Sequence, residues 1–222
     1  CILHCLQAVA QQQYRSIELS LVDNNSTDGS LEQAESFAAA HGIACRVVRN
    51  DTNAGFARAN NQAIRIARGE FVLTLNFDVF LDKAFIKRMV ELMGRDPRAG
   101  FASGKLFQTP EPNSARLFDT TGIELRNLFC SDRGQGHIDA GQYAGGEYIL
   151  GASGCASFFR REMLDDVRSR GEYFDETFNT YVEDVDLSLR AQIRGWRCFG
   201  APDVPLLLGS HWITNPRPVD AK

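Results

Sequence analysis

Short apolar stretches alternate with amphipathic stretches from residue 17 to residue 108, and this alternation limits the possible folds more than any other feature of the chain. Residues 17–23, 43–50 and 70–78 are apolar runs bounded by turn-forming residues, which predicts strands. Residues 30–42, 51–69 and 81–94 have helical periodicity. A fourth strand is predicted over 99–108. This order predicts an α/β fold with a mostly parallel central sheet and flanking helices.

The rest of the chain is less regular. Residues 109–147 are rich in Gly, Asp, Asn and Thr, which indicates a loop and hairpin insertion. The pattern over residues 147–167 predicts a strand and then a helix, and residues 182–196 predict the last clear helix. One face of that helix is apolar and is expected to contact the core; it consists of Val182, Val185, Leu189, Ile193 and Trp196. Four prolines make residues 197–222 hard to place, and residues 201–222 are expected to form an irregular tail.

Composition argues against several classes of protein. The net charge of −4 gives no electrostatic reason to expect a nucleic-acid partner. No apolar run approaches the roughly 20 residues that a membrane-spanning helix needs. The six cysteines have neither a CxxC pair nor zinc-ligand spacing, so we expect buried free thiols in a reducing compartment. A disulfide is the alternative.

Polar residues follow three of the predicted strands. They lie in VDNNSTDGS (22–30), in NDTNAGFARAN (50–60) and in LNFD (75–78). Ligands of open α/β sheets bind outside the carboxyl ends of the strands, so these clusters are expected to face one crevice. The alternative is that they are ordinary turn residues, because Asp, Asn, Ser and Gly are common in such loops.

Asp78 is the strongest acidic candidate. It follows the predicted buried strand 70–78, so it can hold a hard divalent cation beside a diphosphate. Asn76 lies two residues earlier and is expected on the same side of the chain. The alternative role for Asp78 is an Asx turn or a cap for the following helix, but Asp82 is better placed as that cap.

Several familiar kinds of catalytic site are missing. The four histidines and six cysteines form no evident Ser-His-Asp or Cys-His set. GASG at 151–154 lacks the lysine of a phosphate-binding loop, and no G-x-G-x-x-G follows the first predicted strand. The second absence argues against a nicotinamide-dependent dehydrogenase.

Taken in order, these motifs resemble those of family-2 glycosyltransferases, and most closely the bacterial rhamnosyltransferase-like members. The resemblance covers roughly residues 3–200. The motifs that carry it are VDNNSTDGS, NAGFARANNQAI, LNFDV, DRGQGHIDAGQY, GASGCASFFRREML and YFDETFNTYVEDVDLSLRAQIRGW. It implies a GT-A fold and an inverting transfer of a sugar from a nucleotide diphosphate.

The resemblance also implies roles for individual residues. Asp184 matches the catalytic base, and Asp78 would contact Mg²⁺ or Mn²⁺, with His211 as a second metal ligand. Gly151, Ala152 and Glu183 would lie on the acceptor side. The residues expected to line the nucleotide sugar are Asp23, Asn25, Asn53, Phe56, Asn60, Asn76 and Asp78.

By the same resemblance, residues 1–222 form one domain with a nucleotide-binding half (1–108), the insertion, an acceptor and catalytic half (148–200) and the tail. The family's first strand is expected upstream of Cys1. The donor would be a UDP- or dTDP-linked sugar, with rhamnose as one candidate for the sugar. The acceptor would be a saccharide or lipid-linked saccharide in cell-surface polysaccharide synthesis. The expected location is the cytoplasm, with peripheral contact at the inner face of the membrane. The alternatives are a degenerate or truncated module that binds saccharide or nucleotide, and a nucleotidyltransferase.

Overall fold

The structure is a computed structural model that describes residues 2–108, 116–145, 148–178 and 181–209. The helices are α1 (Ile2–Ala10), α2 (Ser30–Ala40), α3 (Phe56–Ile66), α4 (Phe85–Gly94), the short 3-10 helix η1 (Gly154–Ala156), α5 (Arg161–Asp166) and α6 (Glu183–Ile193). The strands are β1 (Glu18–Asp23), β2 (Ala44–Arg49), β3 (Phe71–Leu73), β4 (Val79–Leu81), β5 (Ala99–Phe107), β6 (Phe118–Thr120), β7 (Ile123–Arg126), β8 (Phe129–Asp132), β9 (Tyr148–Ile149), β10 (Ser157–Arg160) and β11 (Arg197–Leu208).

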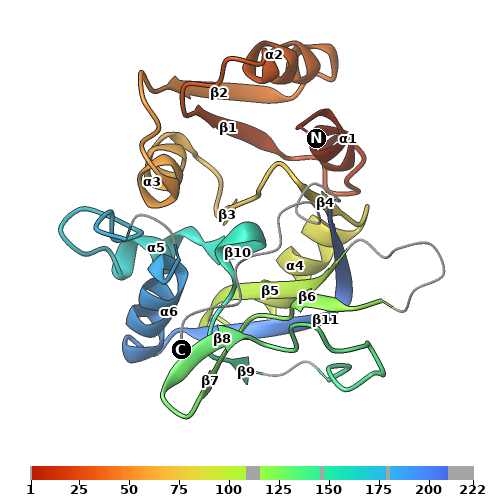
Figure 1. Ribbon diagram of the computed structural model, residues 1–222, viewed down its shortest axis with the longest axis vertical. Coiled ribbons are helices and arrows are strands. Elements are labelled where there is room, and N and C mark those ends of the chain that lie inside the picture. Colours follow the sequence, from red (N-terminus) through yellow and green to blue (C-terminus); the bar gives the residue numbers. More distant parts are fainter. Residues whose placement is uncertain (1, 109–115, 146–147, 179–180, 210–222) are drawn as a thin grey trace.

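The strands form three sheets. β1 and β2 pair in parallel at one end of the molecule, with α2 beside them (Figure 1). The central sheet has seven strands in the order β3-β10-β5-β11-β4, with β6 paired to β5 and β9 paired to β11. β7 and β8 form an antiparallel hairpin within residues 109–147, where the sequence predicts one. The three-dimensional arrangement therefore agrees with the predicted α/β fold.

The prediction of a mostly parallel central sheet is wrong. Within the described residues of that sheet, β5 and β11 are the only parallel neighbours, and the other pairings are antiparallel. Parallel neighbours require a crossover connection, and α5 and α6 supply one between β5 and β11. β4 follows β3 after a short loop, and β10 follows η1, so neither strand enters the sheet through a crossover helix.

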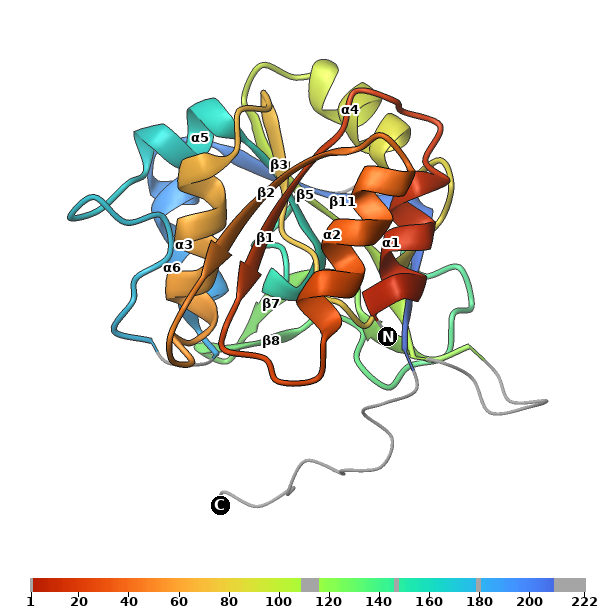
Figure 2. The same cartoon turned by 90° about the horizontal axis from the view of Figure 1, so that it is seen from above.

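Two apolar clusters hold the helices to the two faces of the central sheet. On one face, α4 contributes Phe85, Met89 and Met93, which pack with Ala102 and Leu106 of β5. On the other face, the cluster joins α5, α6 and α3 to the sheet; it includes Phe101, Phe159, Met163, Leu187 and Ile64. α1 and α2 lie side by side (Figure 2). Within the described ranges, no helix is both long enough and apolar enough to span a bilayer.

The predicted irregular tail is wrong for residues 201–208, which belong to β11. Pro202 and Pro205 fit because the register with β5 shifts there: Ala201 pairs with Gly104, and Pro205 pairs with the next residue, Lys105. Residues 202–204 therefore form a bulge. Prolines are tolerated at bulges because ladder hydrogen bonds are already interrupted there. The rest of the tail, from residue 210, lies outside the described residues.

The predicted core face of residues 182–196 is right for Trp196, which is 5% exposed and lies in the apolar cluster, but wrong for most of α6. Val182 and Leu189 are exposed, and Ile193 is 83% exposed. The buried residues of the helix are instead Glu183, Leu187, Ser188 and Ala191. Small side chains allow close approach, because a Cβ atom at Gly151 would lie only 2.3 Å from Ser188 Oγ. Packing against Gly151 therefore decided the rotation of α6 more strongly than side-chain hydrophobicity did.

Candidate functional site

Gly154 and Cys155, at the start of η1, join three of the predicted motifs, and we call this pair the 154–155 turn. The Gly154 N–H donates to Asp184 Oδ2 over 2.9 Å. The Gly154 carbonyl accepts from Thr74 Oγ1 over 3.0 Å. The Cys155 carbonyl accepts from the Asn76 N–H over 2.9 Å. The turn thus connects α6 to the loop between β3 and β4, a connection that the sequence did not reveal.

Phe56, at the start of α3, completes this group. A Cβ atom at Gly154 would lie 3.2 Å from the Phe56 ring and 3.6 Å from Asp184 Cβ. Gly154 is therefore in contact with both side chains, and glycine is the residue that permits this close approach. The structure therefore brings together three predicted site residues, Phe56, Asn76 and Asp184, around Gly154. The sequence analysis considered Gly154 only as part of GASG and predicted no role for it.

Asp184 is half-buried in the first turn of α6, where both carboxylate oxygens accept backbone N–H groups. Gly154 donates to Oδ2, and Val185 donates to Oδ1 over 2.8 Å. Burial raises the pKa of Asp184 and outweighs these hydrogen bonds, which act to lower it. A carboxylate with a raised pKa is a better proton acceptor once it is ionised. Each oxygen also keeps a second lone pair on which a proton can be placed.

Glu183 is buried beside it, with 6% of its surface exposed. Its Oε2 atom has no hydrogen-bond partner among the described residues. Burial raises the pKa of Glu183, and the charge of Asp184 raises it further. The helical periodicity places these carboxylates off the core face, and this prediction is wrong for Glu183. Asp186, in contrast, forms the ion pair with Arg190 at 2.7 Å that the helical spacing indicates.

Asn76 and Asp78 lie in a turn between two short strands and not at the end of one long strand. β3 ends at Leu73, and the Val79 N–H donates to the Asn76 carbonyl over 3.1 Å. Asp78 is 2% exposed. Burial and the Asp78 charge raise the pKa of the nearby Cys5 thiol to about 12. The carboxylate of Asp82 accepts the Ala84 N–H just ahead of α4, as expected for a residue that serves the helix start.

The donor set for a metal ion is limited. In the portion of the chain that the structure describes, no group of three or more His, Cys, Asp or Glu side chains is arranged to hold a metal ion. Asp78 alone could still serve as the protein's ligand, because Mg²⁺ is often held by one or two carboxylates together with substrate phosphates and water. His211 lies outside the described residues.

The loops after β1 and β2 are tied together by amide side chains. Asn24 Oδ1 accepts from Asn50 Nδ2 over 2.9 Å and from the Ala54 N–H over 3.4 Å. Asn50 and Gln62 exchange two hydrogen bonds of 2.9 Å. The polar clusters predicted to share a crevice are therefore connected for these two loops. Sequence reasoning missed all three amides, although Asn24 and Asn50 lie within the quoted loops.

The predicted nucleotide-contacting residues of these loops occupy turn positions. Both Asp23 carboxylate oxygens accept the Ser26 N–H over 3.3 Å, and Asn53 Oδ1 accepts the Gly55 N–H over 2.9 Å. Asn25 is exposed and left-handed, with a φ of 66°. Asn60 donates to the Phe56 carbonyl within α3. These bonds are those of ordinary Asx turns and helix contacts, so the binding roles of these residues stay predictions.

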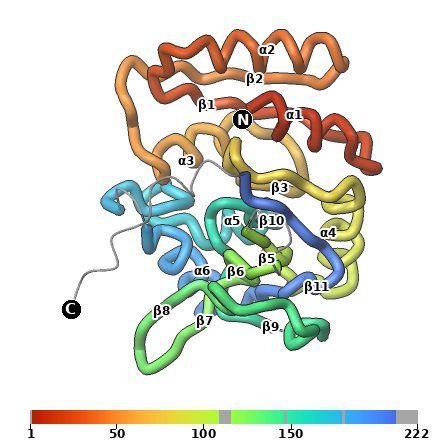
Figure 3. The backbone as a smooth tube through the Cα atoms, turned by 45° about the vertical axis from the view of Figure 1, so that its right-hand side comes forward, coloured from red at the N-terminus to blue at the C-terminus, as the bar shows by residue number. Residues whose placement is uncertain are grey.

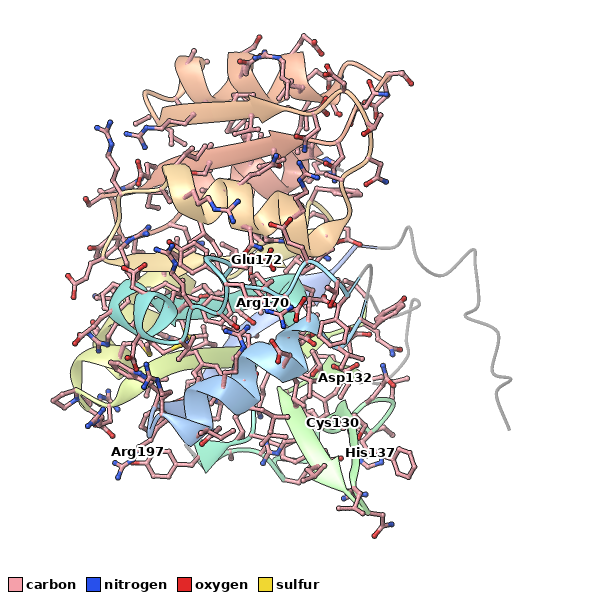
Figure 4. The ribbon with its side chains drawn as sticks, turned by 90° about the vertical axis from the view of Figure 1, so that its left-hand side faces the viewer. Cys130, Asp132, His137, Arg170, Glu172 and Arg197 are labelled. Carbon is pink, nitrogen blue, oxygen red and sulfur yellow. The ribbon has the colours of Figure 1, made fainter. Side chains whose placement is uncertain are left out.

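Asn61, next to Asn60, is fully buried and forms hydrogen bonds to residues 173–176, which precede α6 in the chain. Its Nδ2 donates to the Phe174 carbonyl and to Glu176 Oε1, while Oδ1 accepts the N–H groups of Tyr173 and Phe174. From the other side, Arg190 donates to the carbonyls of Val167 and Tyr173. The two side chains hold the loop 167–176, in which Figure 4 labels Arg170 and Glu172.

The chain then enters α6 through two left-handed residues, Tyr181 with a φ of 70° and Val182 with a φ of 76°. This backbone region is uncommon for bulky and β-branched side chains and costs on the order of 1–3 kcal/mol per residue. Asn61 and Arg190 hold residues 167–176, which precede this entry in the chain. Glu183 and Asp184 follow the entry, at the first turn of α6.

The acceptor-side candidates have clear packing roles. The Gly151 carbonyl accepts the Ile123 N–H over 2.7 Å, and its α-carbon faces Ser188 at close range. Ala152 is buried in the apolar cluster with Leu187. Separately, a cavity of about 770 Å³ lies between α4 and β11, lined among others by Arg88, Lys105 and Pro202. No residue of the candidate site lines that cavity.

The cysteines of the described residues are free thiols, as expected. Burial raises the pKa of Cys155 to about 12, so this thiol stays protonated and is not a nucleophile. The expectation that the thiols are buried is wrong for Cys130, which is exposed on β8.

Solved structures of other proteins share this fold. The structure resembles S. aureus TarS 1-349 in complex with UDP-GlcNAc, with a TM-score of 0.65, 20% identity and coverage of 97% of this chain and 58% of that one. It also resembles the mannosyltransferase PcManGT from Pyrobaculum calidifontis in complex with GDP-Man and Mn²⁺, with a TM-score of 0.65, 21% identity and coverage of 93% and 52%. The fold is therefore that of GT-A enzymes.

The family follows from the sequence comparison. The model described as Glycosyl transferase family 2 matches residues 1–168, and the chain belongs to that family. Relatives include glycosyltransferase GlyG of Streptococcus pneumoniae serotype 4 (26% identical over 56% of this chain and 40% of that protein) and putative glycosyltransferase EpsE of Bacillus subtilis (24%, 79% and 63%). A poly-beta-1,6-N-acetyl-D-glucosamine synthase of Staphylococcus epidermidis is 25% identical over 96% of this chain and 49% of that protein. The chain thus spans less than two thirds of each relative.

Replacing Asn61 with alanine should lower the free energy of unfolding by about 2–3 kcal/mol, because buried backbone groups of Tyr173 and Phe174 lose their partners. The matched Asn60→Ala change should cost less than about 1 kcal/mol, since Asn60 makes one bond within its own helix. Urea unfolding of both variants measures the difference. Equal losses would show that the loop is held by other contacts.

Glu183→Gln should stabilise the folded chain at pH 7 by about 1 kcal/mol, because it removes the charge of a buried carboxylate whose Oε2 atom has no hydrogen-bond partner among the described residues. The folded pKa of Glu183 is raised, so its contribution to stability is greatest at low pH and is lost as pH rises through that pKa. The gain should therefore vanish below about pH 4, where both states are protonated. Urea unfolding at several pH values tests this, with exposed Glu91→Gln as control. A pH-independent difference would contradict the assignment.

Proposed function

We propose that this domain is an inverting glycosyltransferase that moves a sugar from a nucleotide diphosphate to a hydroxyl group of a saccharide or lipid-linked saccharide. The observation that carries the proposal is the Asp184 carboxylate, held by Gly154 beside Phe56 and close to the Asn76 turn. Membership of glycosyl transferase family 2 supports the reaction class. Asp184 is the base.

The chemistry asked of Asp184 is the removal of one proton. The acceptor oxygen attacks the anomeric carbon, the bond from that carbon to the diphosphate oxygen breaks, and the nucleotide diphosphate leaves. The acceptor proton passes to the Asp184 carboxylate. A single displacement of this kind inverts the anomeric centre. The raised pKa suits the task, and the two backbone N–H groups favour the ionised form and fix the direction of the carboxylate.

Asp78 would hold Mg²⁺ or Mn²⁺, together with oxygens of the donor diphosphate, and His211 is the second candidate ligand. A bound divalent cation would neutralise the charge that develops on the leaving diphosphate. The Mn²⁺ in the PcManGT structure supports the choice of metal, since the two chains share the fold. Asp78 is buried in this structure, so its carboxylate must become accessible when donor and metal bind.

The donor is proposed to be UDP- or dTDP-linked. Asp23, Asn25, Asn53, Phe56 and Asn60 would line it, and Gly151, Ala152 and Glu183 would lie toward the acceptor. The UDP-GlcNAc complex of TarS supports a uridine nucleotide. The name of the Staphylococcus epidermidis relative supports a role in polysaccharide synthesis. A donor screen that includes dTDP-rhamnose distinguishes a rhamnosyltransferase from a hexosaminyltransferase.

Asp184→Asn should lower turnover at least about 100-fold while leaving nucleotide affinity nearly unchanged, because the variant keeps the shape but cannot accept the proton. Sugar transfer and UDP titration by calorimetry measure the two effects. Asp186→Asn, on the same helix but paired with Arg190, should keep turnover within a few fold. Comparable turnover in Asp184→Asn and the parent would reject the assignment. Nucleotide binding without turnover by the unaltered protein would indicate a binding module.

Asp78→Ala should remove the dependence of donor binding on Mg²⁺ or Mn²⁺, because the cation loses its carboxylate ligand. Calorimetric titration of UDP with and without the metal gives the comparison. Asp82→Ala is the matched control in the same connection, since that carboxylate serves α4. If metal strengthens donor binding equally in the Asp78→Ala variant, Asp78 has another role.

A further inference from the structure

The β7–β8 hairpin carries an exposed apolar tip. Leu128 is 91% exposed, Phe129 is 78% exposed and Leu125 is 53% exposed. We define these three residues as the hairpin tip. Isolated exposed apolar residues are common on protein surfaces, but adjacent large ones at a protruding turn mark contact sites. The proposed sugar-transfer chemistry uses none of the three.

The turn itself is built from an unfavourable residue. Arg126 pairs with Phe129, which leaves Asn127 and Leu128 as a two-residue loop. Both have positive φ values, 48° and 68°, as a type I′ turn requires. Asn-Gly is the favoured sequence for this turn, because glycine adopts the second position without steric cost. Leucine at that position is therefore a side chain that the fold does not need.

The hairpin is fixed to the body at its base. Ile123 is 3% exposed, and its N–H bonds to Gly151. The Arg133 N–H bonds to the Gly122 carbonyl over 2.8 Å. Figure 4 shows Cys130 and Asp132 on the same hairpin, and the hairpin stands at the opposite end of the molecule from α2 (Figure 3). The tip can therefore contact a flat surface while the β1–β2 end of the molecule points away from that surface.

We propose that the hairpin tip is a membrane-docking element that inserts Leu128 and Phe129 into the interfacial region of an anionic lipid bilayer. A bilayer suits this tip better than a protein partner does. Three side chains bury at most roughly 750 Å² even if each supplies the area of a large aromatic side chain, whereas a stable protein interface takes about 800 Å² per partner.

The remaining groups of the tip fit the same surface. The Arg126 side chain is 71% exposed, and its described carboxylate partner is Glu124 at 3.4 Å. A cation beside apolar side chains matches the arrangement of lipid phosphates above acyl chains. The backbone groups of β7 and β8 that face each other are paired, and those on the two outer edges can bond to water and lipid headgroups in the interfacial region. Docking of this kind does not depend on the proposed sugar transfer.

Sedimentation with vesicles of phosphatidylglycerol and phosphatidylcholine tests the proposal without nucleotide or acceptor. Leu128→Gly combined with Phe129→Ser should lower the partition coefficient roughly tenfold or more, since binding scales with buried apolar area. Leu128→Gly alone should keep or raise the melting temperature, because glycine relieves the left-handed turn. The loss of binding would then not reflect misfolding. Arg126→Gln should weaken binding to phosphatidylglycerol vesicles in particular.

Leu3→Ser is the control for general stickiness, because Leu3 is an exposed apolar residue of α1, outside the hairpin. It should leave partitioning unchanged. Unchanged partitioning of the Leu128→Gly and Phe129→Ser double variant, or an equal loss with Leu3→Ser, would overturn the proposal. So would concentration-dependent dimerisation that the double variant abolishes, measured by light scattering, since the tip would then contact a second copy of the chain.

Discussion

The close approach of α6 to residues 151–154 is the contact on which the candidate site depends. It requires Gly151 against Ser188, because a Cβ atom at Gly151 would lie 2.3 Å from Ser188 Oγ. A Cβ atom at Gly154 would lie 3.6 Å from Asp184 Cβ, an ordinary contact, and 3.2 Å from the Phe56 ring, a tight one. Because α6 is held this close, the Gly154 N–H reaches the Asp184 carboxylate. The same turn also bonds to Thr74 and Asn76. Gly154 and Cys155 therefore fix the position of Asp184, the predicted base, relative to the turn that carries Asp78, the predicted metal ligand.

Burial and hydrogen bonding act against each other at this carboxylate pair. Glu183 and Asp184 are adjacent acids, and burial raises the pKa of both. Asp184 has two N–H donors that partly offset the cost, whereas Oε2 of Glu183 has no partner in the described chain. The strained entry through Tyr181 and Val182 adds to this cost. The first turn of α6 is therefore a locally unstable part of the fold, as functional sites often are.

The sequence was informative where local chemistry decides structure. Apolar runs and helical periodicity located β1, β2, α2 and α4, and the loop motifs identified the family. Prediction failed where distant contacts decide. The rotation of α6 depends on Gly151, which lies 37 positions before Ser188, and no local pattern reports that contact. The antiparallel entry of β10 and the bulge in β11 likewise depend on pairing with β5.

The amide ties between the loops after β1 and β2 have a consequence for how the domain responds to its surroundings. Asn24, Asn50 and Gln62 carry no charge, so neither protons nor salt compete for the bonds that join these loops. These bonds should therefore hold the two loops together across a wide range of acidity and ionic strength. Burial raises the pKa of Glu183 and Asp184, so the chemistry proposed for Asp184 can vary with pH while these amide bonds do not.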